Sequence, residues 1–171
     1  MEVYPKTPAR TLPKFATSNV TSIAPSEVFA ELAGDRPPLI EPGQYDLKYS
    51  HHQTHIMFGR SPKLVLWFKV LTMGQYFDTL LPRYYNVVRL TGKPARNGGF
   101  KVGFHGYFYR EYCRIFSGRL PRRTDRIPMS AFEKVIIIGR VKTVVTGRDQ
   151  SVTPDELQYS VIEELMAVRL T

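Results

Sequence analysis

Residues 63–71, KLVLWFKVL, form the stretch that decides the fold. Apart from two lysines, every residue in it is aliphatic or aromatic, and no glycine or proline interrupts the run. Short runs of this composition are typical of strands that are largely buried. We therefore expect a β-strand here, and the segments on either side supply its neighbours.

Four further segments carry strand signals. Tyrosine and leucine occur at alternate positions in the first, and the run KVIIIGRVKTVV is rich in valine and isoleucine. The last segment contains EELMAV, which fits a helix as well as a strand. Together the patterns predict strands over residues 44–54, 76–88, 134–145 and 157–168.

Two residues within these segments predict irregular strands. Pro82 lacks a backbone N–H, so the third strand should lie at a sheet edge or contain a bulge or break. Gly139 indicates a bend or bulge in the fourth strand.

One helix is predicted over residues 106–116, because four large side chains recur on one face at helical spacing. These are Phe108, Tyr112, Ile115 and Phe116. The order is thus three strands, a helix and two strands, which is the order of an OB-fold. We expect a mainly β (α+β) chain, with a five-stranded OB-like Greek-key barrel and one helix between strands three and four.

The barrel is assigned to residues 39–171. Residues 1–38 are expected to form a largely irregular N-terminal arm, because six prolines break any long element. One short helix over residues 26–33 is compatible with this, with Ser26 as its N-cap and Gly34 after its end. The arm is also a candidate contact between copies of a homo-oligomer.

The charge is strongly positive and unevenly distributed. The chain has 171 residues, with 24 Lys and Arg against 15 Asp and Glu, a net charge of +9 and a pI near 9.8. Residues 39–148 hold 19 of the bases and 6 of the acids, whereas residues 149–171 hold one base and five acids. A basic domain of this kind suggests a polyanionic partner, and a protein kept soluble by its charge is the alternative.

Cysteine and hydropathy bear on the compartment. Cys113 is the single cysteine, so no internal disulfide can form, which fits a reducing cytoplasm. No apolar run approaches the length of a membrane helix, and no secretory signal is visible. We expect a cytoplasmic protein without a membrane partner.

Aromatic residues alternate with bases along the second and third predicted strands. Single strands of nucleic acid present phosphates, which Lys and Arg bind, and unstacked bases, which stack on aromatic rings. On an OB-fold they bind strands two and three and the loops between strands one and two and strands four and five. The corresponding residues are Phe58, Arg60, Lys63, Trp67, Lys69, Arg83, Tyr84, Tyr85, Arg89, Lys142 and Arg148.

Two loops add further bases that can bind phosphates. Each is equally compatible with a simple solvated surface. The first loop, TGKPARNGGFKVG, holds Lys93, Arg96 and Lys101 but lacks the pattern of a nucleotide-phosphate loop. The second, after the predicted helix, holds Arg119, Arg122, Arg123 and Arg126.

Several side chains have two interpretations. Trp67 is either a core residue or a stacking platform. Tyr84 and Tyr85 point to opposite faces of a regular strand, so only one of them can face a ligand. We expect Phe68 and Phe77 in the core, and Arg83 and Arg89 at the surface.

Metal and catalytic sites have little support in the sequence. His51, His52 and His55 form HHxxH without the glutamate of a zinc-protease motif, and loop histidines near phosphate are the simpler interpretation. No nucleophile elbow and no paired carboxylates are visible, so we expect no metal, no cofactor and no enzymatic activity. A nuclease with dispersed carboxylates, including Asp78 or Asp125, stays open as an alternative.

The stretch from Leu39 to Val168 resembles the single-stranded DNA-binding OB-fold proteins of bacteriophages and mobile elements. The resemblance rests on residues 40–45, IEPGQY, on the strand at 63–70, and on Tyr76-Phe77 with Tyr84-Tyr85-Asn86-Val87. It implies binding of single-stranded DNA in replication, recombination or transfer of such an element. The chain departs from the pattern in its long N-terminal arm and in ending without a flexible acidic tail.

The function we expect is therefore non-enzymatic binding of single-stranded DNA with low sequence specificity. Single-stranded RNA is an open alternative, because stacking and phosphate contacts do not read the 2′-hydroxyl. A protein-interaction module on the same OB-like barrel, such as an inhibitor or assembly factor, is the second hypothesis.

Overall fold

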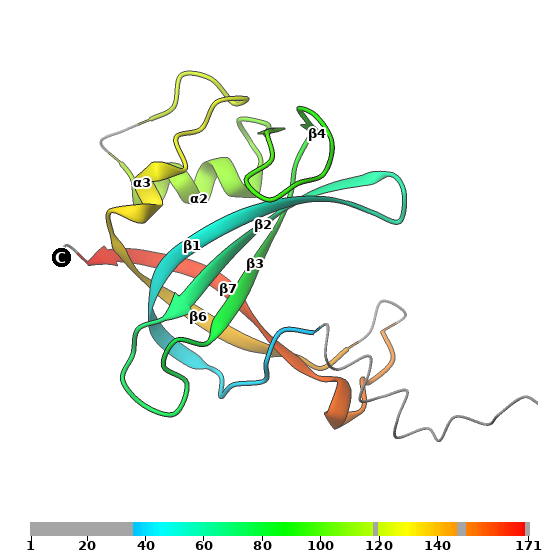
Figure 1. The fold of residues 1–171 in the computed structure, drawn as a ribbon, viewed down its shortest axis with the longest axis vertical. Helices are drawn as coiled ribbons and strands as arrows, with labels where there is room; N and C mark the ends of the chain where they lie inside the picture. The colour runs from blue at the N-terminus through cyan, green and yellow to red at the C-terminus, as the bar shows by residue number, and fades with distance from the viewer. Residues whose placement is uncertain (1–35, 118–119, 147–149, 170–171) are drawn as a thin grey trace, which may run out of the picture.

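The fold was analysed in a computed structural model, which describes residues 36–117, 120–146 and 150–169. Five strands form one antiparallel sheet in the order β3-β2-β1-β6-β7 (Figure 1). The strands are β1 (Gly43–Met57), β2 (Ser61–Val70), β3 (Leu80–Asn86), β6 (Ile136–Val144) and β7 (Tyr159–Arg169).

The remaining elements are short. A two-stranded ribbon, β4 (Arg89–Leu90) and β5 (Phe100–Lys101), precedes the helices α2 (Tyr107–Ile115) and α3 (Ser130–Glu133). A single 3-10 turn, η1 (Asp155–Leu157), leads into β7. No helix in the described ranges is long and apolar enough to span a bilayer.

Most predicted elements are confirmed. The helix and the strands at 44–54, 63–71 and 134–145 appear with small changes at their ends, and the last segment is a strand. The third strand is shorter than predicted, because residues 75–78 form a turn before β3. Pro82 lies in an edge strand as expected, and α3 with the ribbon β4–β5 was not anticipated.

A β-bulge in β1 decides which side chains face the core. The pairing with β2 shifts between Tyr49 and His51, so Ser50 is an extra residue. Tyr49 therefore faces inward opposite Phe68, whereas His51 faces outward opposite Trp67. After the bulge, His52 and Thr54 are the buried residues of β1.

The concave side of the sheet and the two helices enclose an aromatic core. Phe132 of α3 packs against Tyr49 and Phe68 of the sheet and against Tyr112 of α2, with ring centroids 5.6 to 6.1 Å apart. Phe68 is completely buried, which confirms its prediction. In Figure 1 both helices lie at the end of the sheet that also carries β4.

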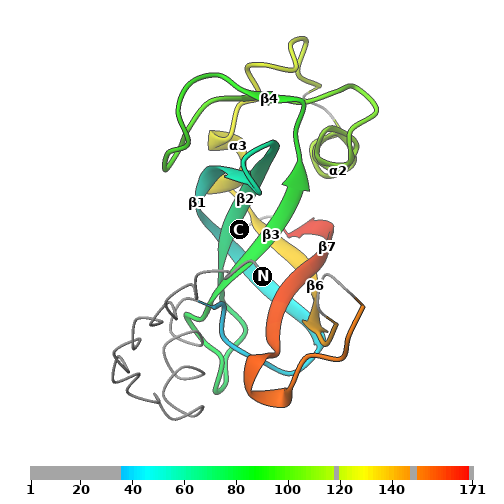
Figure 2. The ribbon, with the colours of Figure 1, turned by 90° about the vertical axis from the view of Figure 1, so that its right-hand side faces the viewer.

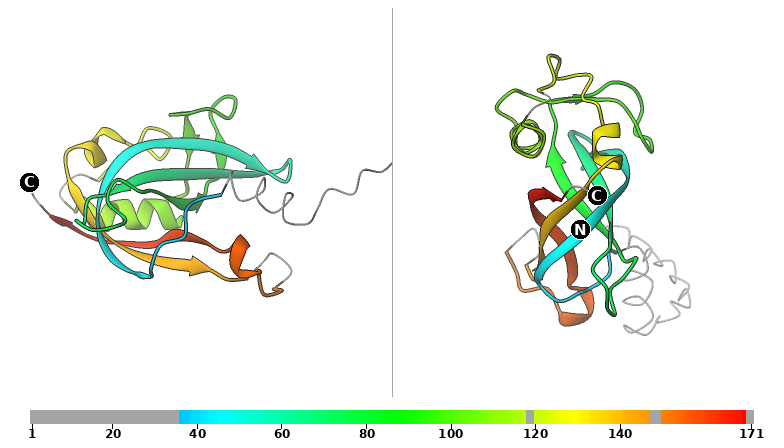
Figure 3. Two further views of the ribbon diagram at one scale, coloured as in Figure 1. Left: turned by 60° about the horizontal axis from the view of Figure 1, so that its bottom comes forward. Right: turned by 90° about the vertical axis from the view of Figure 1, so that its left-hand side faces the viewer.

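The sheet bends so strongly that β6 and β7 lie opposite β2 and β3 (Figure 3). β6 pairs with β7 through two register shifts, one of them at Gly139, which confirms the predicted irregularity. A Cβ at this position would lie 2.3 Å from Cδ1 of the buried Leu47, so any other residue requires the Leu47 side chain to move.

We predicted an OB-like Greek-key barrel; the described residues form an antiparallel five-stranded sheet that does not close. β3 and β7 are the two edges of the hydrogen-bonded sheet, although they lie next to each other (Figure 2). At the two register shifts Met166 and Glu163 are extra residues of β7, and such bulges bend a strand. Side chains rather than a backbone ladder join the edge of β7 to β3.

The joining side chains belong to Arg83, Tyr85 and Glu111. Arg83 on β3 donates to the Glu111 carboxylate of α2 (Nη2–Oε2, 3.2 Å) and to the carbonyl of Ile162 on β7 (3.2 Å). The same carboxylate accepts the Tyr85 hydroxyl (2.6 Å) and the Leu165 backbone N–H of β7 (2.8 Å). One buried carboxylate thus links two strands and a helix.

The first described residues, 36–40, run beside the start of β7. Ser160 donates its backbone N–H to the Pro38 carbonyl (3.1 Å), and its hydroxyl accepts the Ile40 N–H (2.9 Å). The short helix predicted over residues 26–33 lies outside the described residues.

Replacing Glu111 tests this link. Glu111→Ala should lower the free energy of unfolding by about 3–5 kcal/mol, because it leaves the Arg83 charge buried without its partner. Urea unfolding followed by far-UV circular dichroism measures the change. Glu156→Ala, which removes an exposed acid without an ion pair in the described chain, is the control and should cost less than about 0.5 kcal/mol. Equal losses for both variants would contradict the assigned role.

Candidate nucleic-acid interface

The outer face of β1, β2 and β3 carries aromatic, basic and imidazole side chains in three rows. Cross-strand pairing places them as follows: His51 beside Trp67 and Pro82, Gln53 beside Val65 and Tyr84, and His55 beside Lys63 and Asn86. We call these nine residues the outer face. Because the bulge at Ser50 changes the alternation, the His51, Gln53 and His55 side chains join the same face as Trp67.

Trp67 is half-buried and held in a fixed orientation. Its indole Nε1 donates to Oε1 of Gln53 (3.0 Å), and its ring lies parallel to His51 with centroids 6.1 Å apart and 16° between the planes. The ring is thus neither a core residue nor fully exposed. It forms a pre-oriented aromatic surface beside Tyr84, which is 41% exposed.

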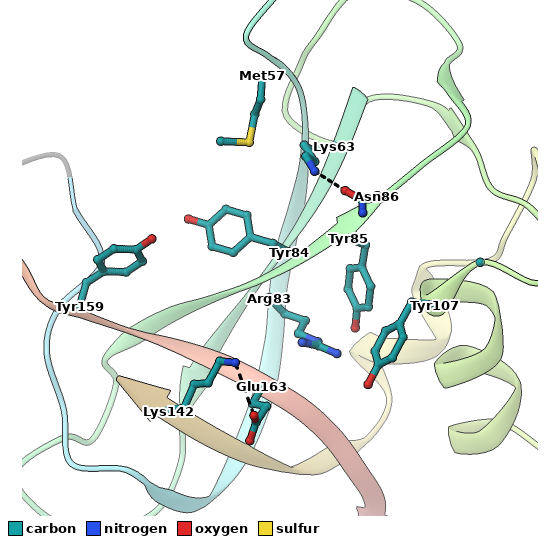
Figure 4. Close-up of a pocket in the computed structure, with 11 residues that line it drawn as sticks. Met57, Lys63, Arg83, Tyr84, Tyr85, Asn86, Tyr107, Lys142, Tyr159 and Glu163 are labelled. Atoms are coloured by element: carbon teal, nitrogen blue, oxygen red, sulfur yellow. Dashed lines mark hydrogen bonds and ion pairs between the residues drawn. The ribbon is translucent and has the colours of Figure 1, made fainter. Parts of the chain in front are cut away.

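Two hollows lie beside Tyr84, and its side chain lines both of them. A hollow of about 250 Å³ lies over the outer face and includes Trp67, Val65 and His55 in its lining. A larger groove of about 860 Å³ lies between β3 and β7 (Figure 4). Met57, Lys63 and Tyr84 line both, so the outer face and the groove form one continuous surface.

Tyrosines and lysines line the groove (Figure 4). Tyr107 at the start of α2 and Tyr159 at the start of β7 face it together with Tyr84. Burial, with a smaller contribution from Tyr159, raises the pKa of Tyr84, which keeps its hydroxyl protonated at neutral pH. Two polar pairs also line the groove: Lys63 donates to Oδ1 of Asn86, and Lys142 lies 3.4 Å from Glu163.

Arg83 and Tyr85 lie beneath this surface. The prediction that Arg83 is exposed is wrong, because Glu111 and the Ile162 carbonyl hold its guanidinium at 9% exposure. Burial opposes its charge, but Tyr85 and Glu111 outweigh burial and raise the pKa of Arg83. Tyr85 is buried and Tyr84 is exposed, which agrees with the prediction that neighbouring residues of one strand point to opposite faces.

The predicted basic residues divide by whether an acid neutralises them. Lys69 pairs with Asp78, Lys142 with Glu163 and Arg123 with Asp125, besides the buried Arg83. Arg148, like Arg119, lies outside the described residues. Within the described ranges, these predicted bases have no ion pair: Arg60, Lys63, Arg89, Lys93, Arg96, Lys101, Arg122 and Arg126.

The glycine-rich loop docks on the free edge of β1. Thr54 donates its backbone N–H to the Ala95 carbonyl (3.0 Å), and Asn97 donates to the His52 carbonyl (2.8 Å). A Cβ on Gly98 would lie 2.3 Å from Oγ1 of Thr54, so the glycine allows this close approach. The docking brings the exposed Arg96 opposite Gln53, next to the outer face.

The loop after α2 presents exposed bases. Arg122 and Arg126 are exposed, as is Arg89 on the ribbon, which confirms the surface position predicted for Arg89. Arg123 makes a bidentate pair with Asp125 (2.7 and 3.0 Å) and lowers the pKa of that carboxyl to about 2.

Two phenylalanines lie at turns rather than in the core. Phe77 is 50% exposed in the turn before β3, so its predicted core position is wrong, because β3 begins only at Leu80. Phe58 is 64% exposed at the turn between β1 and β2, next to Arg60. This turn leads from Met57 into Ser61 and therefore borders both hollows.

The three histidines do not converge. His52 is buried and bonded to Tyr49 and Gly98, whereas His51 and His55 lie on the outer face. The described part of the chain contains no group of three His, Cys, Asp or Glu side chains suited to a metal ion. Asp78 and Asp125, the acids considered for a nuclease, are each ion-paired.

Sequence reasoning missed six residues that line the groove, among them Met57, Tyr107 and Tyr159. Met57, Tyr107 and Tyr159 come from three separate elements and meet only because β7 folds back toward β3. Tyr107 directly precedes the buried Phe108 in α2, so helical spacing placed it off the buried face. Nothing local connects it with Tyr159.

Comparisons with known protein families, with curated protein sequences and with solved structures gave no match to this chain. The geometry of the outer face and the groove therefore carries the functional argument.

His52 should make stability depend on pH. Its Nε2 donates to the Gly98 carbonyl (3.1 Å), and its Nδ1 lies 2.8 Å from the Tyr49 hydroxyl, which can donate to it while the ring is neutral. Burial lowers the pKa of His52, although the Gly98 hydrogen bond acts in the opposite direction. The unfolded chain then takes up a proton near pH 6.5 more readily than the folded chain, so stability should fall as the pH drops below that value.

Thermal unfolding between about pH 7.5 and about pH 5.5 measures this dependence. His52→Gln should flatten the decline, while His55→Gln, at an exposed position, should leave it as it is. His51, whose pKa is lowered by burial, Arg96 and His52, accounts for a remaining slope of the same sign. An identical decline in His52→Gln and the unmodified protein would exclude His52 as its source.

Proposed function

We propose that this protein binds single-stranded DNA without enzymatic activity and with low sequence specificity. The observation that carries the proposal is the continuous surface formed by the outer face and the groove. It combines the aromatic rings of Trp67, Tyr84 and Tyr159 with Lys63, which has no ion pair among the described residues. Bases can stack on the rings while lysine and arginine contact phosphates.

The strand order supports the same proposal. β6 returns after a long connection to lie beside β1, which gives the order β6-β1-β2-β3 of a Greek key. OB-folds are partly open five-stranded barrels that bind oligonucleotides on strands two and three and on adjoining loops. In that correspondence β2 and β3 carry Trp67 and Tyr84, and the turn with Phe58 and Arg60 is the first loop.

Charge supports an extended anionic ligand. Arg60 and Lys63, neither neutralised by a described acid, lie at one end of the outer face, and Arg96 is docked beside its middle row. The resemblance to phage and mobile-element proteins suggests a role in replication, recombination or transfer in a cytoplasm. RNA is a second ligand of the same chemistry, which the binding assay compares directly.

Fluorescence anisotropy with labelled single-stranded DNA, single-stranded RNA and duplex DNA at several salt concentrations tests the proposal. Tight binding to a single strand, weak binding to duplex and a steep salt slope are expected. Equal weak binding to all three would contradict it and favour a protein partner, sought by nuclease-treated pull-down. Cleavage of the strand in the presence of Mg²⁺ would favour the nuclease alternative.

Removing charge that no acid neutralises should change the salt dependence. The double variant Arg60→Ala/Lys63→Ala should lower the slope of log K against log salt by about 0.7 for each phosphate that the protein no longer neutralises. Arg123→Ala is the control, because Asp125 already neutralises that guanidinium. Slopes reduced equally in both would show that only total charge matters.

Removing an aromatic ring should weaken binding at every salt concentration. Tyr84→Ala should cost about 1–3 kcal/mol of binding free energy, the range for one stacked base. Phe77→Ala removes a ring of similar exposure that lines neither hollow. Equal losses in the two variants would remove Tyr84 from the interface.

A further inference from the structure

The groove between β3 and β7 is formed differently from the outer face. The outer face follows paired strands, whereas the groove lies where the sheet edges approach each other without a backbone ladder. Its volume of about 860 Å³ falls within the roughly 300–1,000 Å³ typical of sites that enclose small molecules. A strand that only lies across a surface does not require such a hollow.

The floor of the groove is fixed before any ligand arrives. The Arg83 guanidinium carbon lies 4.9 Å from the ring centre of Tyr85 and 5.1 Å from that of Tyr107. Glu111 holds both Arg83 and Tyr85, and every buried side-chain nitrogen and oxygen in the described residues has a hydrogen-bond partner. A ligand therefore finds a rigid base and interacts chiefly with the walls.

The walls combine flat rings with amines. Tyr84 and Tyr107 are 41% and 55% exposed, and Tyr159 is half-buried near Tyr84. The amine of Lys63 also faces the groove and donates to the neutral Asn86, whereas Lys142 is paired there with the Glu163 carboxylate (Figure 4). Rings that stack and cations that bind phosphate are together the chemistry of a nucleotide.

We propose that the groove binds one nucleotide of the single strand, with its base inserted among the tyrosines and a flanking phosphate beside Lys63, the lysine of the groove that has no ion pair among the described residues. Tyr84 lines both hollows, so the chain of nucleotides passes from the outer face into the groove at this residue. This inference rests on the proposed function. It adds that one nucleotide position along the strand contributes far more to the binding free energy than the other positions do.

A scan with abasic nucleotides tests the inserted base. The probe is the shortest single-stranded DNA that binds with full affinity, expected within about 4–16 nucleotides, so that it cannot change register. One base is removed at each position in turn and the dissociation constant is measured by anisotropy. Removal at one internal position, or at two adjacent positions, should weaken binding by about 5- to 150-fold, the range for one stacked base.

Variants then assign that position to the groove. In Tyr159→Ala the intact strand should bind more weakly, and removal of the sensitive base should cost little more, because base and ring act together. In Tyr159→Phe, which keeps the ring, the pattern should stay as in the unmodified protein. Trp67→Ala, on the outer face alone, should preserve the large loss at the sensitive position. Thermal melting shows that each variant is folded.

The outcomes separate the two proposals. A uniform small loss along the strand, or a sensitive position that persists unchanged in both Tyr159→Ala and Tyr107→Ala, would overturn the inserted base and leave strand binding in place. Failure of the intact strand to bind the unmodified protein would overturn the proposed function itself.

Discussion

The Glu111 carboxylate is the interaction on which the rest of this structure depends. It accepts hydrogen bonds from Arg83 and Tyr85 of β3 and from the Leu165 backbone of β7, so it fixes two sheet edges and α2 together. A buried carboxylate costs several kcal/mol to desolvate and is tolerated because a cation and two further donors meet it. The same arrangement joins β3 to β7 at depth and leaves the space above them open as the groove.

The extra residue Ser50 in β1 also affects several parts of the structure. Because Ser50 is extra, the alternation of β1 reverses, so His52 and Thr54 turn inward and His51 turns outward. His52 and Thr54 form backbone hydrogen bonds with the glycine-rich loop at residues 91–103, which therefore covers the free edge of β1. The same loop places Arg96 opposite Gln53. The bulge therefore determines both the composition of the outer face and the docking of its nearest loop.

Strands and helix were predictable because their signals are local: apolar runs, alternation and helical spacing all lie within a few residues. The direction of Arg83 was not, because its burial depends on Glu111, which is 28 residues away. Glu111 lies three residues after Phe108, so helical spacing places this acid on the buried face of α2, but that spacing does not reveal its partner. Phe77 was misplaced for a similar reason, since strand propensity extends into a turn. The groove residues Met57, Tyr107 and Tyr159 share no sequence pattern, because only the bending of the sheet brings them together.

The net charge of +9 understates how unevenly the positive charge is distributed. Glu163 and Glu164 of β7 pair with Arg140, Lys142 and Arg114, so the β6–β7 side is nearly neutral. Most of the bases that no described acid neutralises lie instead on the turn after β1, at the start of β2, on the ribbon and on its neighbouring loops. A polyanion approaching the protein is attracted to that end first, because charges without a counter-charge dominate the long-range field. In the proposed function, aromatic contacts farther along the outer face and in the groove then hold the strand.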